Sequence, residues 1–235
     1  GGIYDLQGES AKAIDYYTQS LKIDEELGDK KGIAIALNNI GGIYKEQGES
    51  AKAMDYYIQS LKISEEIGNK SGIANSLYNI GLIHKNQGDF AKAIEYYNQS
   101  LKIKEEIGNK KGIAMSLNVI GTIYMNQVDF VKAIDYFTQS LKISEEIGDK
   151  QSIATSLNNI GLIHKNQGDY TKAMDYYKQS LKIKKEIGNK KGIAYSLNNI
   201  GDLYKYQGTY TKAMDYYKQS LKIRENIGEK RGIAI

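Results

Sequence analysis

The sequence predicts an all-α protein built from stacked antiparallel helical hairpins, and three observations support this. The chain of 235 residues contains no proline and 24 glycines, so a helix can continue until a glycine ends it. The glycines recur every 40 residues in two series, one beginning at Gly28 and one at Gly8. No segment shows the period-two alternation of a half-buried strand. A repeat of this length is typical of a solenoid.

Each repeat is predicted to contain two helices, as the unit 69–108 illustrates. Asn69 is a good N-cap, and the first helix is expected to run to about Gln87. A glycine ends it, and Asp89 can cap a second helix, expected over about 90–107. The glycine that closes the unit supplies the left-handed residue with which helices commonly end.

The apolar stripes of the two helices predict how they pair. On the first helix the stripe is Leu77, Ile80, Gly81 and His84, and on the second it is Ala93, Tyr97 and Leu101. A glycine in mid-helix costs about 1 kcal/mol relative to alanine. The cost recurs at Gly41, Gly121, Gly161 and Gly201. We therefore expect the second helix to pass too close to Gly81 for a Cβ, with Ala93 as the matching small residue. A Gly81→Leu substitution is expected to cost about 1–3 kcal/mol or more.

Composition excludes several classes of function. The chain has no cysteine, and a formal net charge of +4 is far from the footprint of a dedicated nucleic-acid binder. No apolar run is long enough to span a membrane, and no signal peptide is evident. The histidines, His84 and His164, occupy a position that is Tyr44 in another unit, so we interpret them as packing residues. No metal or cofactor site, phosphate-binding loop or nucleophile motif is found, and we expect no enzyme activity.

The 20 tyrosines include adjacent pairs such as Tyr96 and Tyr97, which stacking on nucleic-acid bases could explain. By periodicity, at least one tyrosine of each pair faces the helix crossing. Structural use is therefore the preferred interpretation.

Three segments of one unit resemble the tetratricopeptide repeat signature: Asn159–His164, Gln167–Tyr170 and Ala173–Tyr177. The resemblance recurs in every unit, and the 40-residue period is similar to that of Pins/LGN-type scaffolds, Rap-type bacterial regulators and kinesin light chains. It implies a right-handed α-solenoid, a superhelix of stacked hairpins, which serves as a protein-interaction scaffold. The chain departs from the signature by having leucine at the tryptophan position and no proline closing the second helix. At one turn Val128 replaces the glycine, and because β-branched residues disfavour positive φ, we expect that turn to differ.

The units form one array whose boundaries do not match the chain ends. We assign an incomplete unit 1–28, full units 29–68, 69–108, 109–148, 149–188 and 189–228, and a stub 229–235 of a further helix. No polar capping helix flanks the array. We expect the chain to be an excerpt of a longer protein, with self-assembly through uncapped ends as the alternative.

The resemblance places one face of the first helices on the concave side of the superhelix, where three rows of side chains recur. The candidate groove residues are Asn38, Tyr78, Asn118, Asn158 and Asn198 in one row, Lys45, Lys85, Lys165 and Lys205 in a second, and Asn86, Asn126 and Asn166 in a third. Amides suit the backbone of an extended peptide, and lysines favour acidic groups. For the flanking column of Asn39, Asn79, Val119, Asn159 and Asn199, the alternative is that it helps to hold neighbouring helices together. The alternative for all rows is ordinary solvated residues copied by duplication.

The leading hypothesis is a non-catalytic scaffold that holds an extended, acidic segment of a partner protein in its groove. A regulatory segment of a larger signalling protein is the second hypothesis, and a head-to-tail self-associating array is the third. Binding to nucleic acid or membrane is not expected. The absence of cysteine agrees with a cytoplasmic location.

Overall fold

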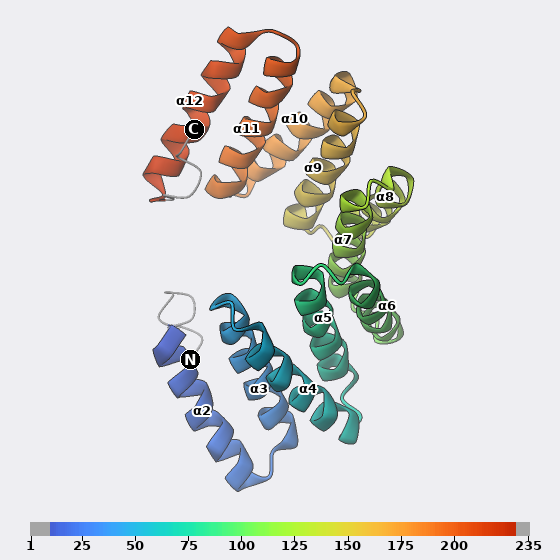
Figure 1. Ribbon diagram of the computed structural model, residues 1–235, viewed down its shortest axis with the longest axis vertical. Helices are drawn as coiled ribbons and strands as arrows, with labels where there is room; N and C mark the ends of the chain where they lie inside the picture. Colours follow the sequence, from blue (N-terminus) through green and yellow to red (C-terminus); the bar gives the residue numbers. More distant parts are fainter. Residues whose placement is uncertain (1–9, 229–235) are drawn as a thin grey trace. The chain divides into compact units, whose positions relative to one another are not determined.

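The structure, a computed structural model, describes residues 10–228 (Figure 1). Within these residues the chain forms eleven helices and no strand, which confirms the all-α prediction. The helices are α2 (Ser10–Leu27), α3 (Lys30–Glu46), α4 (Ser50–Glu66), α5 (Lys70–Asn86), α6 (Phe90–Glu106), α7 (Lys110–Asn126), α8 (Phe130–Glu146), α9 (Lys150–Asn166), α10 (Tyr170–Glu186), α11 (Lys190–Tyr206) and α12 (Tyr210–Asn226). The start of the incomplete first unit and the stub 229–235 lie outside the described residues. No helix within 10–228 has the length and apolar character needed to cross a bilayer.

The chain divides into two compact units, Gly1–Gly112 and Ile113–Ile235. In the first unit, α3 packs on α4 and α5 packs on α6 as consecutive hairpins, and α4 also packs on α5. In the second unit, α9 pairs with α10 and α11 with α12, and α10 packs on α11. Figure 1 shows the two helices of each such hairpin side by side and joined by a short turn. Each unit is therefore a stack of hairpins, as the repeat predicts.

Caps and glycines set the helix ends where the sequence places them. The side chain of Asn69 accepts a hydrogen bond from the Gly72 N–H (3.2 Å), and Asp89 accepts one from the Lys92 N–H (3.2 Å). These bonds satisfy donors that the first turn of a helix leaves unpaired. Helices α5 and α6 each end within one residue of the predicted position. The turn glycine Gly88 has a φ of 81°.

The turn at Val128 keeps the geometry of the glycine turns, so the expectation that it differs was wrong. Val128 has a φ of 64° and is the only non-glycine residue with positive φ in the described part of the chain. The Val128 N–H donates to the Met125 carbonyl (3.1 Å), and the Asp129 N–H donates to the Tyr124 carbonyl (2.9 Å). The glycine turns make the same two bonds. The flanking helices therefore hold a β-branched residue in a conformation that it disfavours.

The mid-helix glycines lie under aromatic rings of the second helix. A Cβ on Gly81 would approach two atoms of the Tyr97 ring to 3.1 Å and the Ala93 carbonyl oxygen to 3.3 Å. The predicted close approach is confirmed, and the Tyr97 ring is the nearest group, whereas Ala93 contributes its backbone. The same position holds Tyr57, Phe137, Tyr177 and Tyr217 in the other hairpins. One tyrosine of each pair is thus used in packing, as expected.

Candidate binding surface

The first helices of successive hairpins are joined by bonds between asparagine side chains. The Nδ2 of Asn79 donates to the Oδ1 of Asn38 (2.9 Å) within the first unit. In the second unit Asn159 donates to Asn118 (2.8 Å) and Asn199 donates to Asn158 (3.0 Å). The suggestion that the column containing Asn79, Asn159 and Asn199 joins neighbouring helices is therefore confirmed. The Oδ1 atoms of Asn38, Asn118 and Asn158 are the acceptors of these bonds.

Hydroxyl groups continue the contacts of Asn38 and Asn118 as a chain of hydrogen bonds. Asn38 donates to the Ser76 hydroxyl (3.1 Å), Ser76 to the Ser60 hydroxyl (3.1 Å), and Ser60 to the Ala34 carbonyl (2.7 Å). The same relay runs from Asn118 through Ser156 and Ser140 to Ala114. We did not single out these serines from the sequence, although each recurs with the repeat. The asparagine row is consequently part of a structural network as well as a candidate contact row.

The lysine and outer asparagine rows are more accessible. Lys45, Lys85 and Lys165 are half-buried, and Lys205 is exposed. Burial lowers the pKa of Lys85 below its ordinary value. The outer row is exposed throughout and consists of Asn86, Asn126 and Asn166. Asn198, which belongs to the inner row, is half-buried. The lysine row and the outer asparagine row therefore retain polar groups that a partner can reach.

Tyr78, the aromatic member of the inner row, packs against its own hairpin. Its ring centroid lies 5.2 Å from that of Tyr97, and the Nζ of Lys104 lies 4.3 Å from the Tyr78 centroid. Burial raises the pKa of Tyr78 and lowers the pKa of Lys104 to about 8. Tyr78 is half-buried, so part of its ring remains accessible.

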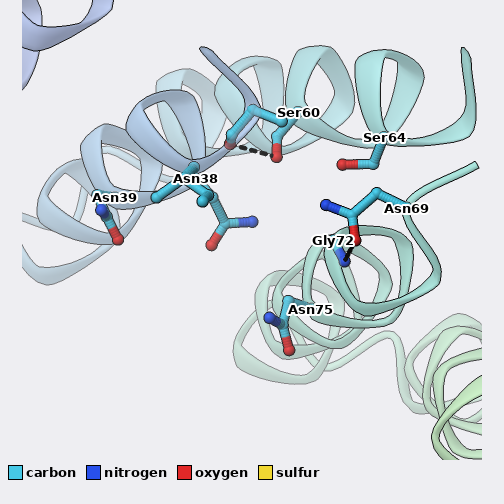
Figure 2. A pocket seen from close by; sticks show the side chains of 9 residues that line it. Asn38, Asn39, Ser60, Ser64, Asn69, Gly72 and Asn75 are labelled. Carbon is cyan, nitrogen blue, oxygen red and sulfur yellow. Dashed lines mark hydrogen bonds between the residues drawn. The ribbon is translucent and has the colours of Figure 1, made fainter. Parts of the chain in front are cut away.

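Two pockets in the first unit bring several of the predicted residues together. One, of about 200 Å³, is lined by Tyr17, Asn38, Asn39, Gly42, Ile43, Lys45, Glu46, Tyr57 and Asn79. The other, of about 110 Å³, lies between α3, α5 and the end of α4, and Figure 2 shows the amides of Asn38 and Asn69 and the hydroxyl of Ser64 directed toward one another around it. No hydrogen-bond partner for the buried Ser64 hydroxyl lies within residues 10–228. Asparagine side chains of α3 and α5 take part in lining both pockets.

The pocket of about 110 Å³ has an equivalent in the second unit. That pocket has a volume of about 350 Å³ and is lined by Gln151, Thr155, Asn158, Asn159, Lys184, Asn189, Lys191, Gly192 and Tyr195. Asn158, Asn159, Asn189 and Gly192 follow Asn38, Asn39, Asn69 and Gly72 by three repeats. Both units thus present the same pocket framework on their first helices.

Each histidine takes the place of a stacking tyrosine. The His84 ring stacks on Tyr96 with centroids 5.4 Å apart, and His164 stacks on Tyr176 at 5.5 Å. At the equivalent position Tyr44 stacks on its neighbour at 5.5 Å. The interpretation of the histidines as packing residues is confirmed. Among residues 10–228 no group of three or more potential metal ligands comes together.

Models of the tetratricopeptide repeat match residues 32–106, 112–186, 152–226 and, with a second model of the same repeat, 1–31. These matches extend over nearly the whole array. The chain belongs to the tetratricopeptide repeat family. Each tetratricopeptide repeat is one hairpin in this structure, and a glycine of its first helix lies under an aromatic ring of its second helix. No curated protein matches the sequence.

Several solved structures have the fold of this tetratricopeptide repeat chain. BtubC (BKLC) from P. vanneervenii superposes with a TM-score of 0.80 at 18% identity, over 94% of this chain and 93% of that one. The apo form of RapI superposes with a TM-score of 0.73 at 19% identity, over 97% of this chain and 96% of that one. A Rap protein complexed with Competence and Sporulation Factor superposes with a TM-score of 0.74 at 17% identity, over 98% of this chain and 74% of that one. At these identities the likeness shows the fold alone.

One position of the first helices varies strongly between units of this tetratricopeptide repeat chain, while the core remains nearly constant. It is Ile35, Asn75, Met115, Thr155 and Tyr195 in successive units. The side chains of Ile35, Met115 and Tyr195 are 52%, 44% and 47% exposed. Four members of the series, all except Met115, line one or other of the two equivalent pockets. Exposed apolar side chains at pocket rims are suited to contact with a partner.

Proposed function

We propose that the chain is a protein-interaction scaffold that binds an extended segment of a partner protein along its first helices. The observation that supports this most strongly is the repeated pocket framework. Asparagine side chains line both equivalent pockets, and one further lining residue differs from one repeat to the next. Such a surface offers hydrogen bonds to a peptide backbone and a different side-chain contact at each step.

The charge of the surface favours an acidic segment. Lys45, Lys85, Lys165 and Lys205 repeat along one row. Half-burial of Lys85 makes its ammonium harder to solvate, which increases the benefit of a carboxylate partner. The Rap protein solved with Competence and Sporulation Factor is an example of this fold with a bound factor. The scaffold uses no chemistry of its own, so we propose no enzymatic role.

The proposal is tested with a library of extended peptides that differ in Asp and Glu content, measured by fluorescence anisotropy. We expect acidic peptides to bind more tightly than neutral ones. The variant Lys85→Ala/Lys165→Ala/Lys205→Ala is expected to weaken that binding by about tenfold or more, since charge-assisted hydrogen bonds are worth about 1.5–3 kcal/mol each.

A matched control removes three lysines from the second helices. Lys62, Lys102 and Lys142 are exposed and lie on α4, α6 and α8. Replacing them with alanine changes the net charge by the same amount, so long-range attraction falls equally in both variants. Equal affinity of the two variants would contradict the assignment of the surface to the first helices.

A further inference from the structure

The buried residue at the end of the second helix distinguishes the two equivalent pockets. It is Ser64 in the pocket of the first unit and Lys184 in that of the second. Lys184 is only 5% exposed, and its position is also serine at Ser144 and lysine at Lys104. Repeats with nearly identical frameworks thus differ in whether they bury a cation beside the pocket.

Lys184 has no carboxylate partner among residues 10–228. Its Nζ donates to the Ser196 hydroxyl (2.9 Å) and lies 5.8 Å from the centroid of the Tyr195 ring. Desolvation lowers its pKa to about 8, with no nearby carboxylate acting in the opposite direction. An ammonium group has three N–H donors, so its hydrogen-bonding capacity exceeds the single bond to Ser196. The group is charged below its pKa and is incompletely compensated.

A second donor at the same pocket is released by this lysine. In the serine repeats the inner asparagine donates to a hydroxyl, as Asn38 does to Ser76. In the lysine repeat the equivalent hydroxyl belongs to Ser196 and accepts its hydrogen bond from Lys184. Asn158 bonds through its Oδ1, which accepts from the Nδ2 of Asn199. Within residues 10–228 the Asn158 Nδ2 makes no bond to Ser196 that corresponds to the bond from Asn38 to Ser76. Asn158 is 5% exposed and lines the pocket with Lys184.

We propose that the pocket between α9, α10 and α11 binds a carboxylate group, held by the ammonium of Lys184 and the amide of Asn158. The pocket lining contains two lysines and no Asp or Glu, so its charge favours an anion. Asn158 and Lys184 both line this pocket, and two N–H donors can meet the two oxygens of one carboxylate. The equivalent pocket of the first unit has no charged residue in its lining and does not share this preference. The site is independent of the proposed function when the carboxylate is free in solution, and it rests on that function when the carboxylate is a side chain of the bound segment.

The test is a titration of the whole chain with sodium acetate at constant ionic strength, at a pH where Lys184 is charged. NMR signals of the Asn158 and Asn199 side-chain amides and of the Lys184 Cε report on the site. We expect a saturable shift with a dissociation constant in the millimolar range, about 10 mM. Sodium chloride at the same concentrations is expected to produce no saturation.

Lys184→Ser is the matched variant, because the chain itself accommodates a buried serine at Ser64 and Ser144. We expect it to fold and to weaken acetate binding at the Asn158 amide by about tenfold or more. Conversely, Ser64→Lys is expected to create a saturable acetate response at the Asn38 amide, since Ser76 is in place to receive the new lysine. Absence of saturation in the wild type, or undiminished saturation in Lys184→Ser, would overturn the proposal.

A second arm identifies the source of the carboxylate. A blocked peptide with one glutamate in a glycine background is compared with the same peptide carrying glutamine. If acetate and the glutamate peptide both saturate the site and the glutamine peptide does not, the source is a side chain of a bound segment. Saturation by acetate with no response to either peptide supports a free carboxylate. Either result keeps the site even when the peptide library described above shows no binding, so failure of the two proposals can be distinguished.

Discussion

Single residues in this chain differ in how well they suit the position that the repeat gives them. Val128 occupies a left-handed turn position that glycine fills elsewhere, and its backbone keeps both hydrogen bonds of the turn. Lys184 occupies a buried position that is serine in two other repeats, at Ser64 and Ser144, and its charge is desolvated. In both cases the near-identical neighbouring repeats provide the reference state, so the cost of the substitution can be measured within one chain.

Val128→Gly is expected to increase the free energy of unfolding by about 1 kcal/mol. The left-handed conformation costs a residue with a Cβ about 1–2 kcal/mol, and the extra entropy of glycine in the unfolded chain offsets part of the gain. Urea unfolding followed by circular dichroism measures the change. The control is Gly168→Val at the equivalent turn, which is expected to lower stability by a similar amount. A Val128→Gly protein no more stable than the wild type would show that the turn is unstrained.

The stability of the wild type relative to Lys184→Ser is expected to depend on pH above neutrality. Burial lowers the pKa of Lys184 to about 8 from its ordinary 10.5, so between these values the unfolded chain binds more protons than the folded one. The contribution of Lys184 to stability therefore rises as pH increases from about 8 to 10.5, and it is constant below that window. Lys191 and Tyr195 line the same pocket and are retained in both proteins. Urea unfolding at a series of pH values measures the difference, and a flat difference across the window would contradict the burial of the ammonium.

At the scale of helices, hairpins are joined by two kinds of contact that the sequence reveals unequally. The crossing of α5 on α6 could be predicted, because a glycine in mid-helix has a cost that only a close contact explains. Helix ends could be predicted because capping side chains and glycines recur with the period. The asparagine bonds between first helices could only be suggested, since helical periodicity places Asn38 and Asn39 on a surface without giving the separation of neighbouring helices.

The burial of Lys184 could not be predicted for a related reason. It lies in the last turn of α10 among charged residues, where a lysine is ordinarily solvated and favoured by the helix dipole. Packing of α11 over this turn covers it, and Ser196 of α11 accepts its hydrogen bond. The available signal was the alternation of serine and lysine at this position, beside neighbours that hardly change.

The bond between Asn199 and Asn158 is expected to join α11 to α9 by a measurable coupling energy. Asn158→Ala and Asn199→Ala should each lower the free energy of unfolding by about 1–3 kcal/mol, because each leaves a buried amide without its partner. The double variant should lose less than the sum, with a coupling of about 0.5–1.5 kcal/mol. Urea unfolding of the four proteins measures the cycle. Asn166→Ala, on the exposed row of α9, is the control and should change stability by less than about 0.5 kcal/mol. Strict additivity would show that the bond does not hold the helices together.

At the scale of the whole molecule, stability is expected to be local. Within each unit a helix packs on the next helix in the chain, and contacts also join neighbouring first helices, as between α3 and α5 and between α9 and α11. Proteins built in this way have stabilities that approximate a sum over repeats and their nearest neighbours. The effect of a defect should therefore be confined to the hairpin that contains it and the hairpins adjacent to it.

Gly81→Leu tests this locality by disrupting one crossing. The new side chain must displace the Tyr97 ring, at a cost of about 1–3 kcal/mol. Amide hydrogen exchange followed by mass spectrometry should show rates in α4–α6 that rise by about tenfold or more, because 1.4 kcal/mol of local stability corresponds to a factor of 10. Rates in α9–α12 should remain at the wild-type level. Gly161→Leu, which meets the Tyr177 ring in the same way, should give the opposite pattern, with acceleration in α9–α11 and wild-type rates in α4–α5. Acceleration of exchange throughout residues 10–228 by either variant would mean that the hairpins unfold as one cooperative body, because a local defect could then open helices that it does not touch.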